Sequence, residues 1–112
     1  MEVKRGDIVV AAIPGDYGGK PRPALVVQSD LFNPTHASVL LCPITSELVA
    51  APLFRVDIPP SPDNGLVTAS QIMADKIHAT RRDRIGKRIG RAAPADLAAV
   101  ERALAMMLAF SH

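Results

Sequence analysis

One arginine of this chain stands between two prolines, Pro21 and Pro23, directly before the apolar run 24–27. Proline fixes φ and pushes the residue before it into an extended conformation, so Arg22 is presented at the mouth of a strand on a stiff backbone. A guanidinium mounted in this way suits anion binding or catalysis. An ordinary solvated arginine at a strand entrance is the alternative that this stretch alone leaves open.

A threonine at the end of another apolar run is the second candidate. Thr45 follows the run 38–43, where a hydroxyl can face a cleft instead of the core. The alternative is a turn-forming threonine bonded to nearby backbone. Arginine stays protonated below pH ~12, so a proton acceptor must come from elsewhere. Asp16, Asp75 and His78 are the candidates for that role, and the sequence does not rank them.

The segment 14–20 combines three glycines with a proline, an acid and a base, which is loop chemistry. Because Arg22 lies at its far end, this loop could act as a flap, with Tyr17 available to stack on a base and Lys20 adding a cation. A plain hairpin connection is the alternative.

Basic residues concentrate in one stretch of the chain. Residues 76–91 hold seven of the thirteen Lys and Arg but only one of the eleven acids, although the net charge is only +2. This asymmetry indicates a polyanion such as nucleic acid, or an acidic partner protein. A solvated face whose charges pair with acids elsewhere is equally consistent. The residues expected to contact nucleic acid here are Lys76, Arg81, Arg82 and Arg84.

Several classes of protein are disfavoured by what the sequence lacks. The three histidines are scattered, a Cys pair is missing, and neither a P-loop nor a GxGxxG pattern is present, so we expect no metal and no cofactor. The single cysteine, Cys42, lies in an apolar run and suits a reducing compartment. The N-terminus lacks the apolar region of a signal peptide, and no run approaches a membrane span. We expect a cytoplasmic protein whose 112 residues form one domain, 1–112.

The apolar pattern predicts a mostly antiparallel β-barrel with one C-terminal helix. Pro94 and Asp96 lie in the expected first turn of that helix, and its apolar stripe packs on the sheet. Further apolar residues widen the stripe, so part of the helix could lie in a dimer interface; burial in its own core is the simpler alternative. The predicted strands are 7–13, 24–29, 38–43, 53–58 and 85–91, with 66–74 extended and the helix over 94–110.

These parts suit metal-free cleavage of RNA by its own 2′-hydroxyl. The reaction passes through a phosphorane with extra negative charge, which a fixed guanidinium such as Arg22 binds bidentately. Thr45 could hold a phosphate oxygen or orient the 2′-oxygen. The basic segment would bind flanking phosphates and make the affinity salt-dependent.

Taken in order, the residues resemble the MazF/PemK family of bacterial toxins, the ribonuclease members of toxin–antitoxin pairs. The likeness covers nearly the whole chain. It is carried by residues 5–9 (RGDIV), the Gly-rich loop leading into residues 22–26 (RPALV), residues 43–46 (PITS), residues 70–77 (SQIMADKI) and residues 81–86 (RRDRIG).

The resemblance implies an SH3-like barrel of the CcdB/MazF type, a homodimer and metal-independent cleavage of single-stranded RNA at short sequences, with 2′,3′-cyclic phosphate and 5′-hydroxyl products. The catalytic Arg and Thr of the family fall on Arg22 and Thr45. An acidic antitoxin would occupy the same groove. Several relatives carry an Arg near the position of His78, so this chain departs from the pattern at the third catalytic partner.

Two functions of other classes stay open at this point. One is a CcdB-like gyrase poison that binds a protein and cleaves nothing; members of that group carry a tryptophan in the C-terminal tail, and this chain has none. The other is a non-catalytic SH3-like module that binds RNA or protein.

Overall fold

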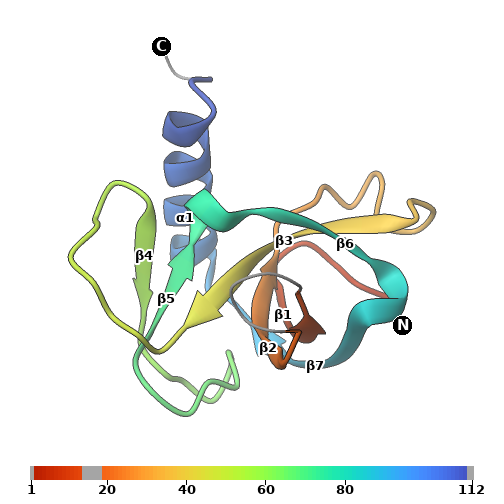
Figure 1. Cartoon of the computed structure of the whole chain (residues 1–112), viewed down its shortest axis with the longest axis horizontal. Coiled ribbons are helices and arrows are strands. Elements are labelled where there is room, and N and C mark those ends of the chain that lie inside the picture. Colours follow the sequence, from red (N-terminus) through yellow and green to blue (C-terminus); the bar gives the residue numbers. More distant parts are fainter. Residues whose placement is uncertain (1, 14–18, 111–112) are drawn as a thin grey trace.

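The computed structural model describes residues 2–13 and 19–110. Within these residues, seven strands and two short 3-10 helices precede one α-helix near the C-terminal end (Figure 1). In chain order these elements are β1 (Asp7–Ala12), β2 (Pro21–Val26), β3 (Ser38–Thr45), β4 (Arg55–Ile58), β5 (Ser70–Met73), η1 (Ala74–Lys76), β6 (His78–Arg81), η2 (Arg82–Arg84), β7 (Ile85–Arg91) and α1 (Pro94–Met107).

The strands form one antiparallel sheet in the order β4-β5-β3-β2-β1-β7, and β6 adds to β3. The longest strand, β3, joins the two parts of this sheet. Its first residues pair with β6 and its middle with β2, whereas Ile44 and Thr45 pair with β5. Figure 1 shows β3 in yellow, running from the side of β6 to the side of β4 and β5. This change of partner curls the sheet into a barrel-like shape.

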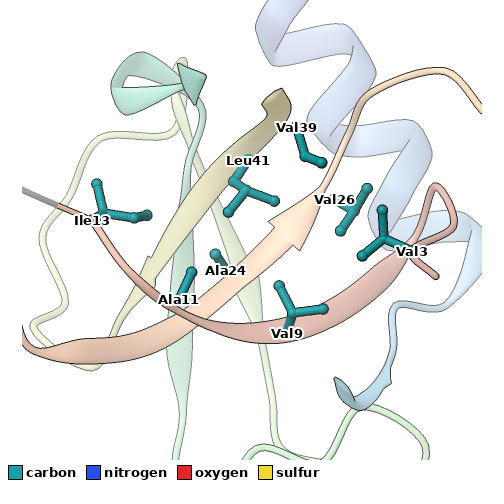
Figure 2. Close-up of a cluster of buried hydrophobic side chains, with 8 residues drawn as sticks. All are labelled: Val3, Val9, Ala11, Ile13, Ala24, Val26, Val39 and Leu41. Atoms are coloured by element: carbon teal, nitrogen blue, oxygen red, sulfur yellow. The ribbon is translucent and has the colours of Figure 1, made fainter. Parts of the chain in front are cut away.

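Two apolar clusters fill the two faces of the central strands. Val9 and Val26 point into the first cluster, drawn in Figure 2, while their neighbours Ile8 and Leu25 point into the second. Successive side chains of a strand point to opposite faces, so a strand buried on both faces reads as a continuous apolar run. The second cluster lies beneath α1, which contributes Val100.

The predicted fold class is confirmed, with corrections at the element ends. The second strand begins at Pro21 rather than Ala24. Because β2 pairs with β3 only over Ala24–Val26, neither proline has to donate a backbone N–H to β3. The third strand continues to Thr45. The predicted strand 53–58 forms only from Arg55, and the extended stretch 66–74 contains only β5.

The helix is shorter than predicted and only part of its apolar stripe is buried. Leu97, Val100 and Leu104 pack in the second cluster, but Met107 and Leu108 remain almost half exposed. Figure 1 shows the reason, since the C-terminal end of α1 projects beyond the strands. None of the described helices is long and apolar enough to cross a membrane.

Candidate active site

The register between β2 and β3 brings the two principal candidate residues to one place. Ala24 pairs with Pro43, Leu25 with Cys42 and Val26 with Leu41. Arg22 lies two residues before Ala24 and Thr45 two residues after Pro43, so both residues lie just beyond the same end of this pairing. Both residues line one cavity of about 290 Å³.

Arg22 is fixed through its backbone, and its side chain lies at the surface. It pairs with Ala11 of β1 within the proline-flanked start of β2, and its side chain is exposed to solvent. A planar guanidinium carries five N–H donors, which match the oxygens of a phosphate group. The position therefore combines a stiff mounting with access for a ligand.

Thr45 ends β3 and is only 8 % exposed. Its Oγ1 accepts a hydrogen bond from the Glu47 amide at 3.0 Å, so Thr45 does bond nearby backbone as a turn-forming threonine would. That bond uses one lone pair of the oxygen, and the hydroxyl proton is still available for donation. A threonine oriented by its own turn can thus donate to an anionic oxygen in the cavity.

The remaining cavity residues come from four different parts of the chain. Arg55 comes from β4, Met73 from β5 and Lys76 from η1. The last two lining residues, Ser46 and Glu47, directly follow Thr45. Among the residues that line this cavity, three carry a positive charge and one a negative charge, which is the balance expected for binding an anionic group.

Sequence reasoning overlooked Ser46, Glu47 and Arg55. The first two could have been suspected because they adjoin Thr45. Arg55 left no such signal, since it reaches the cavity only through the pairing of β4 with β5, in which Arg55 faces Met73.

Of the predicted proton acceptors, the two that lie within the described residues, Asp75 and His78, do not line the cavity. Asp75 is exposed on η1, and the half-buried His78 places its Nδ1 3.2 Å from Thr80 Oγ1. Asp16 lies outside the described residues, as does Tyr17. Glu47 is the carboxylate that the described part of the chain supplies to the cavity wall.

Only part of the basic segment 76–91 lies at the cavity. Lys76 lines the cavity, and Lys20 is exposed beside the start of β2. Arg81, however, pairs with Ser38 at the opposite end of β3. Seven residues of strand separate Ser38 from Thr45, which corresponds to about 23 Å at the usual rise.

Several cations of this segment are bound within the protein. Arg82 donates to the main-chain carbonyls of Asn33 and His36, which favours a structural role. Arg81 pairs with Asp83, and Arg84 is exposed next to them. The buried carboxylate of Asp7 pairs with Arg91 and, at 3.6 Å, with Arg88.

A second cavity of about 300 Å³ adjoins the first and shares Arg22 and Ser46 with it. Its lining is mainly apolar and includes Ile44, Leu66 and Ile89. Arg22 therefore lies between a polar cavity and an apolar one. A nucleotide has the same division, with a charged phosphate beside a flat, largely apolar base.

The other reactive groups do not form a second site. Burial, together with the smaller effect of the negative charge of Asp75, raises the pKa of the Cys42 thiol to about 12, so the thiol stays protonated near neutral pH. Within residues 2–13 and 19–110, no three His, Cys, Asp or Glu side chains are grouped so that they could hold a metal ion.

The fold and the cavity together define a small β-barrel-like protein with a cationic site between two strands. The model of a protein family, the PemK-like and MazF-like toxins of type II toxin–antitoxin systems, matches residues 4–108. A probable endoribonuclease MazF of Mycolicibacterium smegmatis is 44% identical over 106 residues, which are 95% of this chain and 96% of the relative. The chain belongs to this toxin family.

Solved structures agree with this assignment. MazF of Deinococcus radiodurans superposes with a TM-score of 0.81 at 26% identity, covering 97% of this chain and 98% of that one. A MazE–MazF structure from the same organism gives a TM-score of 0.79 at 26% identity, with the same coverage. The resemblance seen in the sequence and the MazF-type fold are thus confirmed.

Proposed function

We propose that this chain is the toxin of a type II toxin–antitoxin pair, an endoribonuclease that cleaves single-stranded mRNA without a metal ion and so inhibits translation and growth. The observation that supports this most strongly is the presence of Arg22 and Thr45 in one cation-lined cavity. The match to the toxin family and the similarity to a probable endoribonuclease support the same function. One toxin domain spans residues 1–112, and the protein works in the cytoplasm, where mRNA lies.

Arg22 binds the scissile phosphate. The 2′-oxygen attacks phosphorus, and negative charge grows on the non-bridging oxygens as the phosphorane forms. A guanidinium preorganised to face these oxygens stabilises that charge more than it stabilises the starting diester, which lowers the barrier. Lys76, on the same cavity wall, adds positive charge.

The Thr45 hydroxyl donates a hydrogen bond to a phosphate oxygen, while the Glu47 amide holds the hydroxyl oxygen in place. Because the donor is oriented before the substrate arrives, no reorganisation is needed during the reaction. The base next to the scissile phosphate occupies the adjoining apolar cavity.

Glu47 is the proton acceptor for the 2′-hydroxyl. Its carboxylate takes that proton as the new oxygen–phosphorus bond forms, and the 5′-oxygen leaves with a proton from a general acid or water. The products are a 2′,3′-cyclic phosphate and a free 5′-hydroxyl. This assignment replaces Asp75 and His78, which lie outside the cavity.

Removing either principal side chain should abolish most cleavage without unfolding the protein. For Arg22→Ala and for Thr45→Ala we expect kcat/KM on a single-stranded RNA in EDTA to fall by about 100-fold or more, because each removes a preorganised donor. Lys87→Ala is the matched control, since it removes an exposed charge outside the cavity. Near wild-type cleavage by either variant would exclude that residue from the site.

Loss of the proton acceptor should show in the pH profile. In Glu47→Gln we expect kcat/KM to fall by roughly 100-fold or more, with loss of the rise that accompanies deprotonation of a carboxylate. Asp75→Asn and His78→Gln should keep that rise. An unchanged profile in Glu47→Gln, or a collapse confined to His78→Gln, would reassign the base.

The partners follow from charge and exposed apolar area. A MazE–MazF structure is known from D. radiodurans. For this chain, an acidic antitoxin segment binds across the cationic cavity and blocks it. Apolar side chains that remain exposed around the end of α1 bury against a second copy in a homodimer. They are Leu53, Met106, Met107, Leu108 and Phe110.

The proposed dimer can be tested by measuring the native molecular mass in a sedimentation experiment. We expect the wild-type chain to sediment at twice the mass of one chain, and Met107→Glu with Phe110→Glu to shift it toward a monomer. Leu31→Glu changes an exposed apolar residue that is not part of α1 and should leave the dimer intact. A monomeric wild-type chain, or dissociation by Leu31→Glu as well, would contradict this interface.

A further inference from the structure

Two side chains from the paired strands β4 and β5 hold the segment that follows Thr45. The Arg55 Nη1 atom donates to the Glu47 carbonyl at 2.8 Å and to Gln71 Oε1 at 3.0 Å. Gln71 in turn bonds both main-chain groups of Val49: its Oε1 accepts from the amide at 3.1 Å, and its Nε2 donates to the carbonyl at 2.9 Å. We call Arg55 and Gln71 the loop clamp.

The clamped segment needs such support. Residues 46–50 are exposed and belong to neither a strand nor a helix, so they have no ladder of backbone bonds to keep them ordered. Gln71 is itself only 6 % exposed and is the strand partner of Thr45 in the β3–β5 pairing. The clamp therefore ties the loop to a rigid part of the sheet, directly beside the threonine.

Arg55 adopts an arrangement that does not serve stability alone. Its Nε atom is buried and has no hydrogen-bond partner among the described residues, although its Nη1 atom bonds two acceptors. Buried donors normally find acceptors, and an exception calls for an explanation. The explanation here is that the guanidinium is placed to reach the Glu47 carbonyl from the cavity wall.

We infer that Arg55 and Gln71 are positioning residues for RNA cleavage, which hold residues 46–49 so that the Glu47 amide orients the Thr45 hydroxyl. The chain of contacts is continuous. Arg55 bonds the Glu47 carbonyl, and the Glu47 amide bonds Thr45 Oγ1. The same contacts hold the main chain of Glu47, which lines the cavity. This inference rests on the proposed function, but the state of the loop can be measured without any activity.

The first measurement is amide hydrogen exchange in the free protein. In Arg55→Ala we expect the Glu47 and Val49 amides to exchange at least about tenfold faster, because local opening becomes easier, while amides of β2 keep their protection. The matched control is Arg5→Ala. Arg5 is also a half-buried arginine that bonds a main-chain carbonyl, that of Val27, but it lies past the other end of β2 from Arg22.

The second measurement is single-turnover cleavage of an RNA oligonucleotide in EDTA. We expect Arg55→Ala to lower the cleavage rate by roughly 10- to 100-fold, the usual cost of misplacing a catalytic group. In Arg55→Lys, which keeps the positive charge at the cavity, affinity for the same oligonucleotide with a 2′-deoxy scissile residue should change little. Arg5→Ala should cleave at the wild-type rate. Arg55→Lys keeps the charge but not the planar fork, and its loss of rate should follow its loss of amide protection.

The outcomes separate this inference from the proposed function. If Arg55→Ala leaves the Glu47 and Val49 amides protected, or loosens them without slowing cleavage, the clamp is not a positioning device. Full activity of Arg55→Lys with an unprotected loop would show that only the charge matters and would also overturn the inference. Should Arg55→Ala fail to fold, the comparison between Arg55→Lys and Arg5→Ala decides in the same way. If the wild-type chain cuts no RNA, the proposed function fails and the catalytic role of the clamp fails with it.

Discussion

The register between β2 and β3 is the constraint on which the rest of this site depends. Because side chains alternate along a strand, a slip of one residue would send Arg22 and Thr45 to opposite faces of the sheet. The buried contacts of Leu25 and Cys42 prevent that slip, since both would have to leave the second apolar cluster. Core packing thus determines the geometry of the exposed Arg22 guanidinium and of the Thr45 hydroxyl.

The cavity forms where β3 changes partners. Up to Pro43 the strand pairs with β2, and from Ile44 it pairs with β5, so the start of β2 is left without a neighbour on that side. The site then takes its positive charge from Arg22, Arg55 and Lys76, which lie on three separate elements. The dense basic segment contributes only one of these three, because much of it is bound elsewhere, as Arg91 is to Asp7.

What could be predicted from the sequence reflects local constraints. The prolines around Arg22 and the end of an apolar run at Thr45 are local features. The resemblance to the toxin family places both residues in one site without any information on strand pairing. Arg55 and Glu47 could not be found in this way. Their place depends on which strands pair and on how the nine-residue loop between β3 and β4 folds back, and neither property is encoded in a short window. The internal partners of Arg82 and Arg91 could not be found in this way either, since they are distant in sequence.

The most direct test of the central claim is a map of RNA ends after digestion by the wild-type chain in EDTA. If Arg22 and Thr45 stabilise attack by the 2′-hydroxyl, the cuts will fall at one short sequence in single-stranded regions. Every cut will carry a 2′,3′-cyclic phosphate on one side and a 5′-hydroxyl on the other. Cuts that leave 5′-phosphates, or cleavage that EDTA abolishes, would contradict the account.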